Sequence, residues 1–198
     1  RDDVESRGLG DVYKRQVNQL IEYDQRLYKD ALTGVYNRRY FEEQIKKKNE
    51  NAGVAVIDMD DFKLCNDTLG HSVGDAALRT MVKTVKHCIR KTDILIRYGG
   101  DEFVIIIKGI SHDEMVAFCS KLRERVLDCG LEHRYSKVMP MVTISQGACW
   151  GIPLRGNRMW DYLHVADDML YKVKNFSRNN YCIGDIMESD DIVMDLSQ

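Results

Sequence analysis

The segment that decides the fold lies at residues 93–107 and reads DILIRYGGDEFVIII. Two apolar runs, Asp93–Arg97 and Glu102–Ile107, lie on either side of the four residues YGGD at 98–101. Short apolar runs bounded by turn residues are typical of buried strands. Because a Gly-Gly centre accepts positive φ at both turn positions, the segment predicts a tight β-hairpin.

The chain around this hairpin predicts alternating strands and helices. The continuous apolar run GVAVI at Gly53–Ile57 is typical of a central strand buried on both faces. Further strands are expected at 139–148 and 180–183. Apolar residues at three- and four-residue spacing predict helices at 38–48, 72–90, 112–128 and 159–175.

Two of these helices begin with the form of a capping box, in which a serine and an acidic residue three positions later satisfy the first backbone N–H groups. The sequences are SVGD at 72–75 and SHDE at 111–114. The second helix would turn four apolar side chains inward: Met115, Phe118, Leu122 and Val126.

The resulting order is β-α-β-β-α-β with added helices. It matches an α+β fold with a ferredoxin-like βαββαβ core, in which a central, mostly antiparallel sheet is flanked by helices. The chain has 198 residues, enough for one domain with extensions. We expect that domain at residues 31–184.

The composition is that of an ordinary globular protein. Hydrophobic residues make up 44% of the chain and charged residues 30%, which excludes collagen-like, low-complexity and disulfide-scaffold classes. With 29 Lys and Arg against 31 Asp and Glu, the net charge of -2 gives no electrostatic case for binding a nucleic acid polymer.

The cysteines and the hydropathy pattern both favour a cytoplasmic protein. The six cysteines form no CxxC pair and are not spaced for zinc, so buried, reduced thiols are expected. No apolar run approaches the roughly 18 residues of a membrane span, and the N-terminus lacks the apolar segment of a signal peptide. We therefore expect no direct membrane contact, although a longer protein could be tethered through an N-terminal region.

The two ends of the chain differ from the domain between them. Residues 1–16 are polar without a clear period, and we interpret them as a disordered or non-native leader. Residues 17–30 predict a connector helix with an apolar stripe of Val17, Leu20, Ile21 and Leu27. Residues 185–198 form an acidic tail without a basic residue, which we expect to fray.

Acidic residues follow the central strand and the hairpin turn. Asp58 and Asp60 come directly after the run GVAVI, while Asp101 and Glu102 close the hairpin turn. In a βαββ arrangement the hairpin can lie beside the first strand, which would bring these four carboxylates together. Such a cluster is strongly repulsive unless a cation lies between its members, and hard oxygen ligands suit Mg²⁺.

Other residues near these acids could hold a substrate. Gly99 and Gly100 carry no side chain, so a planar group or a phosphate could approach the backbone. Lys63, in the loop after Asp61, could contact phosphate oxygens. Lys174 and Arg178 are four residues apart at a helix end and would share a face, either binding phosphates or compensating the helix dipole.

An amide and a carboxylate near residue 70 could recognise a guanine base. Asp75 could accept hydrogen bonds from the guanine N–H groups, and Asn66 could complement the same edge. The alternative for Asp75 is a purely structural role in the capping box at the start of its helix.

Four motifs together resemble the GGDEF domain family, and they cover residues 30–183 with each spacing kept. They are DALTGVYNRR at 30–39, the pattern DxDxFKxxNDxxGHxxGD at 58–75, RYGGDEF at 97–103 and ADxxLYxxKxxxRN at 166–179. Gln146, where the family usually has an apolar residue, and Ser177, where it usually has glycine, depart from the pattern.

The resemblance implies a diguanylate cyclase with a nucleotide-cyclase or polymerase-palm-like fold. Such an enzyme condenses two GTP into cyclic di-GMP and two pyrophosphates, using Mg²⁺ or Mn²⁺ at two ions per active site. Asp58, Asp101 and the Met59 carbonyl would hold metal, and Asp101 or Glu102 would act as the base. The implied substrate-binding residues are Phe62, Lys63, Asn66, His71, Asp75, Gly99, Gly100, Lys174 and Arg178, with Lys63 also assisting catalysis.

The resemblance further implies a homodimer, because each domain holds one GTP and two must face each other. The helix at 17–30 could deliver that dimer, and an upstream sensor domain would be absent from this chain. Arg90 and Asp93 resemble the family's RxxD inhibitory site, where the product cyclic di-GMP binds.

Two other functions remain open from the sequence. One is a catalytically inactive GGDEF domain that binds cyclic di-GMP or GTP as a receptor. The other is a related cyclase that makes a different cyclic dinucleotide, for which Asp75 would be the discriminating residue.

Overall fold

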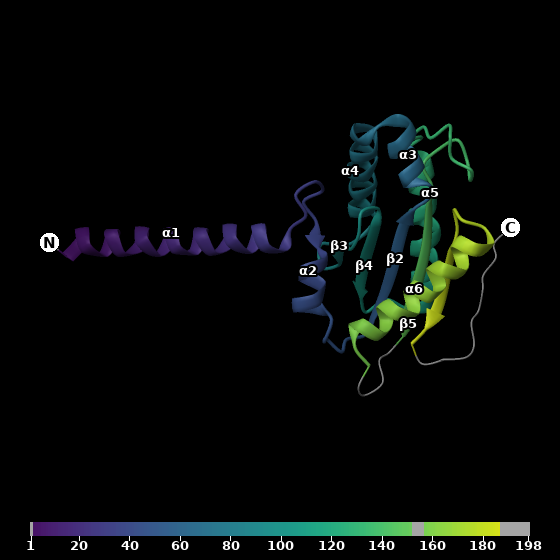
Figure 1. Cartoon of the computed structure of the whole chain (residues 1–198). Helices are drawn as coiled ribbons and strands as arrows, with labels where there is room; N and C mark the ends of the chain where they lie inside the picture. Colours follow the sequence, from purple (N-terminus) through teal and green to yellow (C-terminus); the bar gives the residue numbers. More distant parts are fainter. Residues whose placement is uncertain (1, 152–156, 187–198) are drawn as a thin grey trace.

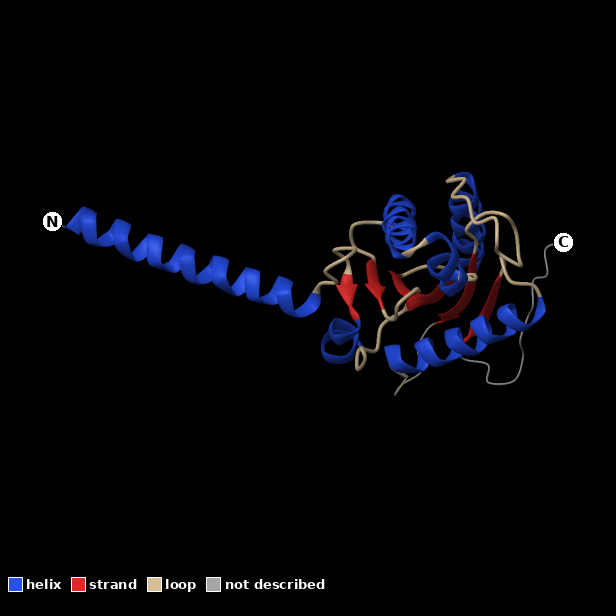
Figure 2. Ribbon diagram, turned by 45° about the horizontal axis from the view of Figure 1, so that its top comes forward, coloured by secondary structure: helices blue, strands red, loops and turns tan. Residues whose placement is uncertain are grey.

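The computed structural model describes residues 2–151 and 157–186, which form one mixed sheet with helices on both faces (Figures 1 and 2). Within this part of the chain the sheet has six strands in the order β1-β3-β4-β2-β5-β6. The strands are β1 (Tyr36–Asn37), β2 (Ala52–Met59), β3 (Ile94–Arg97), β4 (Glu102–Lys108), β5 (Ile144–Gly151) and β6 (Tyr181–Asp185). The helices are α1 (Asp2–Tyr28), α2 (Arg38–Tyr40), the π-helical turn η1 (Phe41–Ile45), α3 (Phe62–Leu69), α4 (His71–Cys88), α5 (His112–Asp128) and α6 (Met159–Phe176).

The strand pairing confirms the ferredoxin-like core. The central strand β2 pairs antiparallel with β4 on one side and with β5 on the other. Strands β3 and β4 form the antiparallel hairpin expected from residues 93–107. The parallel strands β1 and β6 extend this core at its two edges.

The alternation of side chains along β2 divides the core into two layers. Ala55, Ile57 and Met59 pack with the apolar residues of α4 and α5 on one face of the sheet. Val54 and Val56 point to the other face and pack with α6. Figure 2 shows these two helical layers on opposite sides of the strands. The residues of β4 alternate in the same way, so even-numbered residues of both strands face α6.

Helix α6 lies close against β5 because residue 147 is glycine. A Cβ at Gly147 would overlap the backbone of Ala166 and Leu170. The neighbouring Gln146 is fully buried on the opposite face, where its amide Nε2 donates a hydrogen bond to the Cys119 carbonyl at 2.8 Å. That hydrogen bond satisfies the amide nitrogen of Gln146, whereas its Oε1 is buried without a partner among the described residues.

Several predicted elements differ from the observed ones. Residues 62–69 form a separate helix, α3, where the sequence predicted a loop, and the strand predicted at 139–148 begins only at Ile144. The segment predicted as one helix at 38–48 contains the short α2 and the π-helical turn. The short strand β1 was not predicted.

The two predicted helix starts have different outcomes. The capping box at Ser111 is confirmed, with both reciprocal hydrogen bonds to Glu114 present. The predicted box at Ser72 is wrong, because α4 begins one residue earlier after Gly70, which makes no side-chain cap. In α5, Cys119 is fully buried, whereas the predicted core residue Phe118 is only partly buried.

Helix α1 projects from the domain as a single 27-residue helix (Figure 1). It extends much further toward the N-terminus than the predicted connector at 17–30, and it includes residues that we expected to be disordered. Its exposed side chains include Tyr13, Leu20 and Ile21. Of the predicted acidic tail, Asp185 ends β6, while residues 187–198 lie outside the described residues.

All six cysteines are free thiols, as expected for reduced cysteines. Four are buried, Cys88 is half-buried and Cys129 is exposed, so the expectation of burial is wrong for Cys129. None of the described helices is long and apolar enough to span a membrane.

Candidate active site

The end of β2 and the start of β4 bring acidic residues from two distant stretches of chain together. Asp58 and Glu102 are direct partners in the antiparallel register of the two strands. One residue further along, the Met59 N–H donates to the Asp101 carbonyl at 3.3 Å. Because Asp58 and Glu102 occupy even-numbered positions, both lie on the face covered by α6.

A lysine from α6 neutralises one of these acids. Lys174 Nζ lies 2.8 Å from Asp58 Oδ2, and the two side chains are largely buried, with 34% and 17% of their surfaces exposed. Burial raises the pKa of Asp58, Lys174 opposes that rise, and the nearby Asp101 and Asp60 add to it. The cationic group thus stabilises a carboxylate that its surroundings otherwise disfavour.

Helix α6 also contributes an acid that the sequence reasoning left without a role. Burial raises the pKa of Glu102, and the largest electrostatic contribution to that rise comes from Asp167, followed by Asp58. Burial likewise raises the pKa of Asp167. Asp167 and Lys174 are seven residues apart on α6 and therefore lie on the same side of that helix. That spacing is the signal that could have identified Asp167.

Asp60 lies near Asp58, but its carboxylate is already held by other groups. Its buried carboxylate accepts hydrogen bonds from Thr143 Oγ1 at 2.8 Å, Ser145 Oγ at 2.7 Å and the Asn179 backbone N–H at 3.0 Å. These three donors satisfy the carboxylate and tie the end of β2 to β5 and to the turn before β6. The prediction that four carboxylates surround a cation is therefore wrong for Asp60.

The remaining acids fit a divalent cation only together with other ligands. Among the described residues, no three His, Cys, Asp or Glu side chains cluster closely enough to hold a metal ion by themselves. Asp58 and Asp101 are nevertheless hard oxygen donors, and burial and like charge both disfavour the carboxylate form of Asp58. This donor set suits Mg²⁺, which commonly takes one or two protein carboxylates and completes its shell with water and substrate phosphates.

The three candidate phosphate-binding cations come from different places. Lys63 is exposed and lies in the first turn of α3, not in a loop as predicted. Lys174 and Arg178 do not share a helical face, because α6 ends at Phe176 and Arg178 adopts a left-handed backbone with φ of 50°. Arg178 Nη1 instead contacts Asp61 Oδ1 at 3.1 Å.

The departure at Ser177 has no cost in backbone strain. Its φ is -138°, a conformation that any residue adopts, so a glycine is not needed there. The positive φ values fall instead on the next two residues, Arg178 and Asn179.

The candidate guanine-binding residues lie around the junction of α3 and α4. A Cβ at Gly74 would overlap Asn66 Oδ1, so the two helices are in direct contact at this point. His71 and Asp75 are four residues apart on α4 and therefore share a face. Asp75 makes no hydrogen bond or ion pair within the described chain, and the capping role that was its alternative is absent.

The hairpin turn is open but differs from the predicted geometry. Neither Gly99 nor Gly100 has a positive φ, so the predicted type of tight turn is wrong. The Tyr98 and Gly99 N–H groups both donate to the Glu102 carbonyl, at 2.8 and 3.1 Å. No described atom lies within 4 Å of a Cβ built on Gly100, so the turn can accept a group that approaches its backbone.

Arg97, at the end of β3, connects the hairpin turn to Asp30. Its guanidinium donates to the Gly100 carbonyl at 2.7 Å and to Asp30 Oδ1 at 3.1 Å. Although burial opposes the change, hydrogen bonds from Thr33 and Arg97 lower the pKa of Asp30. The first residue of the motif at 30–39 is thereby connected to the turn at 98–101.

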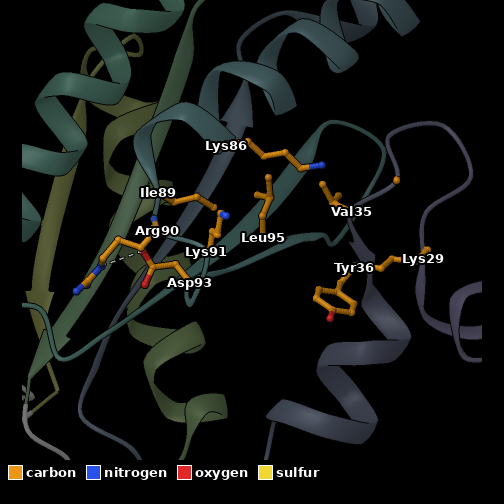
Figure 3. Close-up of a pocket in the computed structure, with 10 residues that line it drawn as sticks. Lys29, Val35, Tyr36, Lys86, Ile89, Arg90, Lys91, Asp93 and Leu95 are labelled. Atoms are coloured by element: carbon orange, nitrogen blue, oxygen red, sulfur yellow. Dashed lines mark hydrogen bonds and ion pairs between the residues drawn. The ribbon is translucent and has the colours of Figure 1, made fainter. Parts of the chain in front are cut away.

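Arg90 and Asp93 form a separate site at the far end of the hairpin (Figure 3). The backbone N–H and Nε of Arg90 donate to Asp93 Oδ2 at 2.8 and 3.3 Å, and Nη2 donates to the Lys108 carbonyl at 3.1 Å. Lys108 ends β4, six residues from Glu102, so the two sites are roughly 20 Å apart along the strand. Asp93 is almost fully buried while the Arg90 side chain is 60% exposed.

A cavity of about 350 Å³ lies beside this pair. Four cationic residues are among those that line it: Lys29, Lys86, Arg90 and Lys91. Asp93 Oδ1 is buried and has no hydrogen-bond partner within the described residues. The cavity therefore combines positive charge with an unused acceptor.

The sequence profile of the family described as "Diguanylate cyclase, GGDEF domain" matches residues 27–180. The chain belongs to the GGDEF family. Among curated relatives, Probable diguanylate cyclase DgcC of Escherichia coli strain K12 is 34% identical over 185 residues, covering 86% of this chain and 48% of that protein. Diguanylate cyclase DgcM of the same strain is 33% identical over 158 residues, covering 76% of this chain and 37% of that protein. This GGDEF chain thus spans less than half the length of these relatives.

Solved GGDEF structures share the fold. The coiled coil and GGDEF domain of DgcB from Caulobacter crescentus, in complex with c-di-GMP, superposes with a TM-score of 0.77 at 24% identity, covering 91% of this chain and 99% of that one. The active GGEEF domain of a diguanylate cyclase from Vibrio cholerae has a TM-score of 0.57 at 27% identity, covering 68% of this chain and 83% of that one. At 24% identity, the match to DgcB shows only that the two proteins share a fold.

Proposed function

We propose that this GGDEF domain is a diguanylate cyclase, which condenses two GTP into cyclic di-GMP and two pyrophosphates, with one GTP per subunit of a homodimer. The observation that carries the proposal is the pairing of Asp58 with Glu102 across β2 and β4, beside Asp101 and under Lys174. Family membership and relatives named diguanylate cyclase support the same activity.

Asp58, Asp101 and the Met59 carbonyl would hold Mg²⁺ or Mn²⁺, at two ions per site. Bound divalent ions would neutralise phosphate charge and assist loss of the proton from the attacking 3′-hydroxyl. Lys174 is the counter-ion of Asp58 when no cation is bound. With a cation held by Asp58, Lys174 would be available to bind a phosphate, together with the exposed Lys63.

Asp101 or Glu102 would accept the proton of the 3′-hydroxyl. The two are neighbours at the start of β4, and both stay candidates for this role. The remaining chemistry is phosphoryl transfer, in which alignment and charge neutralisation supply most of the rate enhancement. Asn66, His71 and Asp75 would hold the guanine, at a distance from the acids along α3 and α4.

The homodimer follows from the reaction, because each domain offers one such site and two GTP must react with each other. Helix α1 offers the surface for it. Its apolar side chains Tyr13, Val17, Leu20 and Leu27 follow one another at spacings of four, three and seven residues, and Tyr13 and Leu20 are each 68% exposed. Such a stripe is typical of the seam of a parallel coiled coil.

Arg90 and Asp93 would bind the product and limit its accumulation. The cationic cavity beside them suits a ligand with two phosphates, and an arginine can hold a phosphate or a guanine edge by two parallel hydrogen bonds. We expect this reaction in the cytoplasm, where GTP is available and thiols stay reduced.

Incubation of the purified chain with GTP and Mg²⁺, followed by chromatography of the nucleotides, tests the proposal. Cyclic di-GMP and pyrophosphate are the expected products, and chelation of the metal should stop their formation. Binding of cyclic di-GMP or GTP without any product would overturn the cyclase and favour the receptor. A different cyclic dinucleotide from mixed GTP and ATP would favour the second alternative.

A further inference from the structure

The turn between β2 and α3 contains a strained residue that the proposed mechanism does not use. Asp61 has φ of 54° and ψ of 27°, a left-handed conformation that few non-glycine residues adopt. It lies between Met59, a candidate metal ligand, and Lys63, a candidate phosphate ligand. A strained conformation persists only where the surrounding structure holds it in place.

Three hydrogen-bond donors from remote parts of the chain hold the Asp61 carboxylate. Ser136 Oγ and the Lys137 backbone N–H donate to Oδ2 at 3.1 and 2.8 Å, and Arg178 Nη1 donates to Oδ1 at 3.1 Å. Ser136 and Lys137 belong to the connection between α5 and β5. Arg178 belongs to the turn after α6, so two separate segments converge on one side chain.

A buried histidine holds the backbone of the same residue. His133 Nε2 lies 3.1 Å from the Asp61 carbonyl oxygen, and His133 is fully buried. Because a carbonyl oxygen can only accept, Nε2 must be the donor in this contact. Nδ1 is buried and has no partner among the described residues. The imidazole therefore provides a hydrogen bond to the Asp61 carbonyl, while one of its own ring nitrogens lacks a hydrogen-bond partner among the described residues.

The loop between α5 and β5, which contains His133, is stabilised by hydrogen bonds between its own residues. The His133 N–H donates to the Pro140 carbonyl at 3.1 Å, and the Ser136 N–H donates to the His133 carbonyl at 3.0 Å. An isolated bridge between Glu132 and Met141 closes its base. The connection is thus a compact loop that presents an imidazole, a hydroxyl and a backbone N–H to one residue.

We propose that this loop, residues 131–143, is a positioning clamp on the β2–α3 turn, with His133 as its principal positioning residue. By fixing Asp61 the clamp sets the position of Lys63 and of the cation-binding end of β2, and it keeps Arg178 beside them. The inference deepens the proposed function and rests on it. The clamp acts on the turn that precedes Lys63, whereas Asp75 lies on the next helix, so its loss should weaken triphosphate binding more than guanine binding.

The matched variants are His133→Leu, which removes the donor, and His133→Gln, which keeps an N–H at the position of Nε2. Amide hydrogen exchange of residues 61–65 reports the clamp whether or not the protein is active. We expect faster exchange there in H133L, with the exchange of residues 70–75 unchanged and with H133Q resembling the parent. Unchanged exchange at 61–65 in a folded H133L would overturn the clamp independently of the proposed cyclase.

Binding measures the positioning itself, with Ca²⁺ in place of Mg²⁺ to prevent turnover. The Kd for GTP should rise about tenfold in H133L because the phosphate-binding groups are less well positioned, and the Kd for GMP should stay within about twofold. In active enzyme the KM for GTP should rise in parallel, and H133Q should restore both values. Equal weakening of GTP and GMP, or faster exchange with an unchanged Kd for GTP, would contradict the positioning role.

If H133L does not fold, a second pair at Asp61 keeps the test decisive. Glycine and asparagine both accept a left-handed backbone, but only asparagine keeps an oxygen that Ser136 and the Lys137 N–H can bond. Asp61→Gly should show the faster exchange and the weaker GTP binding, and Asp61→Asn should show a clearly smaller effect. Indistinguishable GTP affinities in D61G, D61N and the parent would refute the proposal.

Discussion

Lys174 Nζ and Asp58 Oδ2 lie 2.8 Å apart, which joins α6 to the end of β2 at the point where the acids of β4 begin. The pair is more than a surface ion pair, because burial raises the pKa of Asp58 and Lys174 is the cation that opposes this rise. A substrate-bound cation would replace Lys174 as the partner of Asp58. The buried Asp58 carboxylate would thus have a cationic partner both without substrate, where it is Lys174, and with substrate, where it would be the metal ion.

Lys174→Met should destabilise the protein in the absence of metal by about 1–3 kcal/mol, because the Asp58 carboxylate then lacks its partner. Addition of GTP with Ca²⁺ should recover more of this stability than it adds to the parent. Thermal unfolding with and without these ligands measures both effects. Lys172→Met, two residues earlier on α6, is the matched control and should change little. Equal melting temperatures for K174M and the parent would contradict the assigned ion pair.

Asp101→Ala and Glu102→Ala should each reduce the rate of cyclic di-GMP formation at least about 100-fold, the usual range for a lost proton acceptor or metal ligand. The fold should persist in D101A, since the Asp101 side chain makes no hydrogen bond within the described chain. Product chromatography gives the rate and circular dichroism checks the fold. Asp113→Ala, on an exposed helix start, controls for removal of an acid. Near-parental rates in either variant would show that the acidic cluster is not the reaction centre.

Asp75→Ser should relax the preference for guanine, because one neutral hydroxyl oxygen on a shorter side chain cannot replace the two charged oxygens that would accept from the guanine N–H groups. The preference for GTP over ATP, measured as a ratio of kcat/KM values, should fall about 10-fold or more for the loss of a hydrogen bond to a charged acceptor. Asp67→Ser, on the exposed side of α3, is the control. A preserved ratio in D75S would remove Asp75 from the guanine site.

Arg90→Ala should weaken inhibition by cyclic di-GMP without lowering the initial rate in dilute product. The guanidinium is exposed and lies at the opposite end of β4 from the acids, so its loss leaves the reaction centre intact. Initial rates over a series of added cyclic di-GMP concentrations measure the effect. Arg79→Ala, on the exposed face of α4, is the matched control. The idea of a product site fails if the R90A inhibition curve coincides with that of the parent.

Asp30→Asn should lower stability at neutral pH by about 1 kcal/mol, the usual net value of such hydrogen bonds. The pKa of Asp30 is lower in the folded protein than in the unfolded chain, so its stabilisation is complete above the ordinary Asp value of about 3.9. That stabilisation is lost as the pH falls through the folded-state pKa. The difference between D30N and the parent in chemical unfolding should therefore shrink below about pH 4.

The order of strands and helices could be predicted from the sequence because it depends on local patterns. The apolar runs at 53–57 and 93–107 predicted β2 and the β3–β4 hairpin, and Ser111 predicted its capping box. The sequence also predicted that Asp58, Asp101 and Glu102 lie together, and they do so at one end of the central strands β2 and β4. What failed locally was the geometry of the turn at Gly99 and Gly100, whose hydrogen bonds depend on Glu102 and Arg97.

The sequence by itself determined the fold class and the family, because these depend on periodicity and spacing within short segments. Only the tertiary structure decided which partners the candidate site residues have. Asp58 and Asp60 are two residues apart, yet one contacts Lys174 and the other is satisfied by Thr143, Ser145 and Asn179. The clamp of His133 on Asp61 spans 72 positions of the chain. Such pairings depend on strand register and on how α6 packs against β5, which no local pattern encodes.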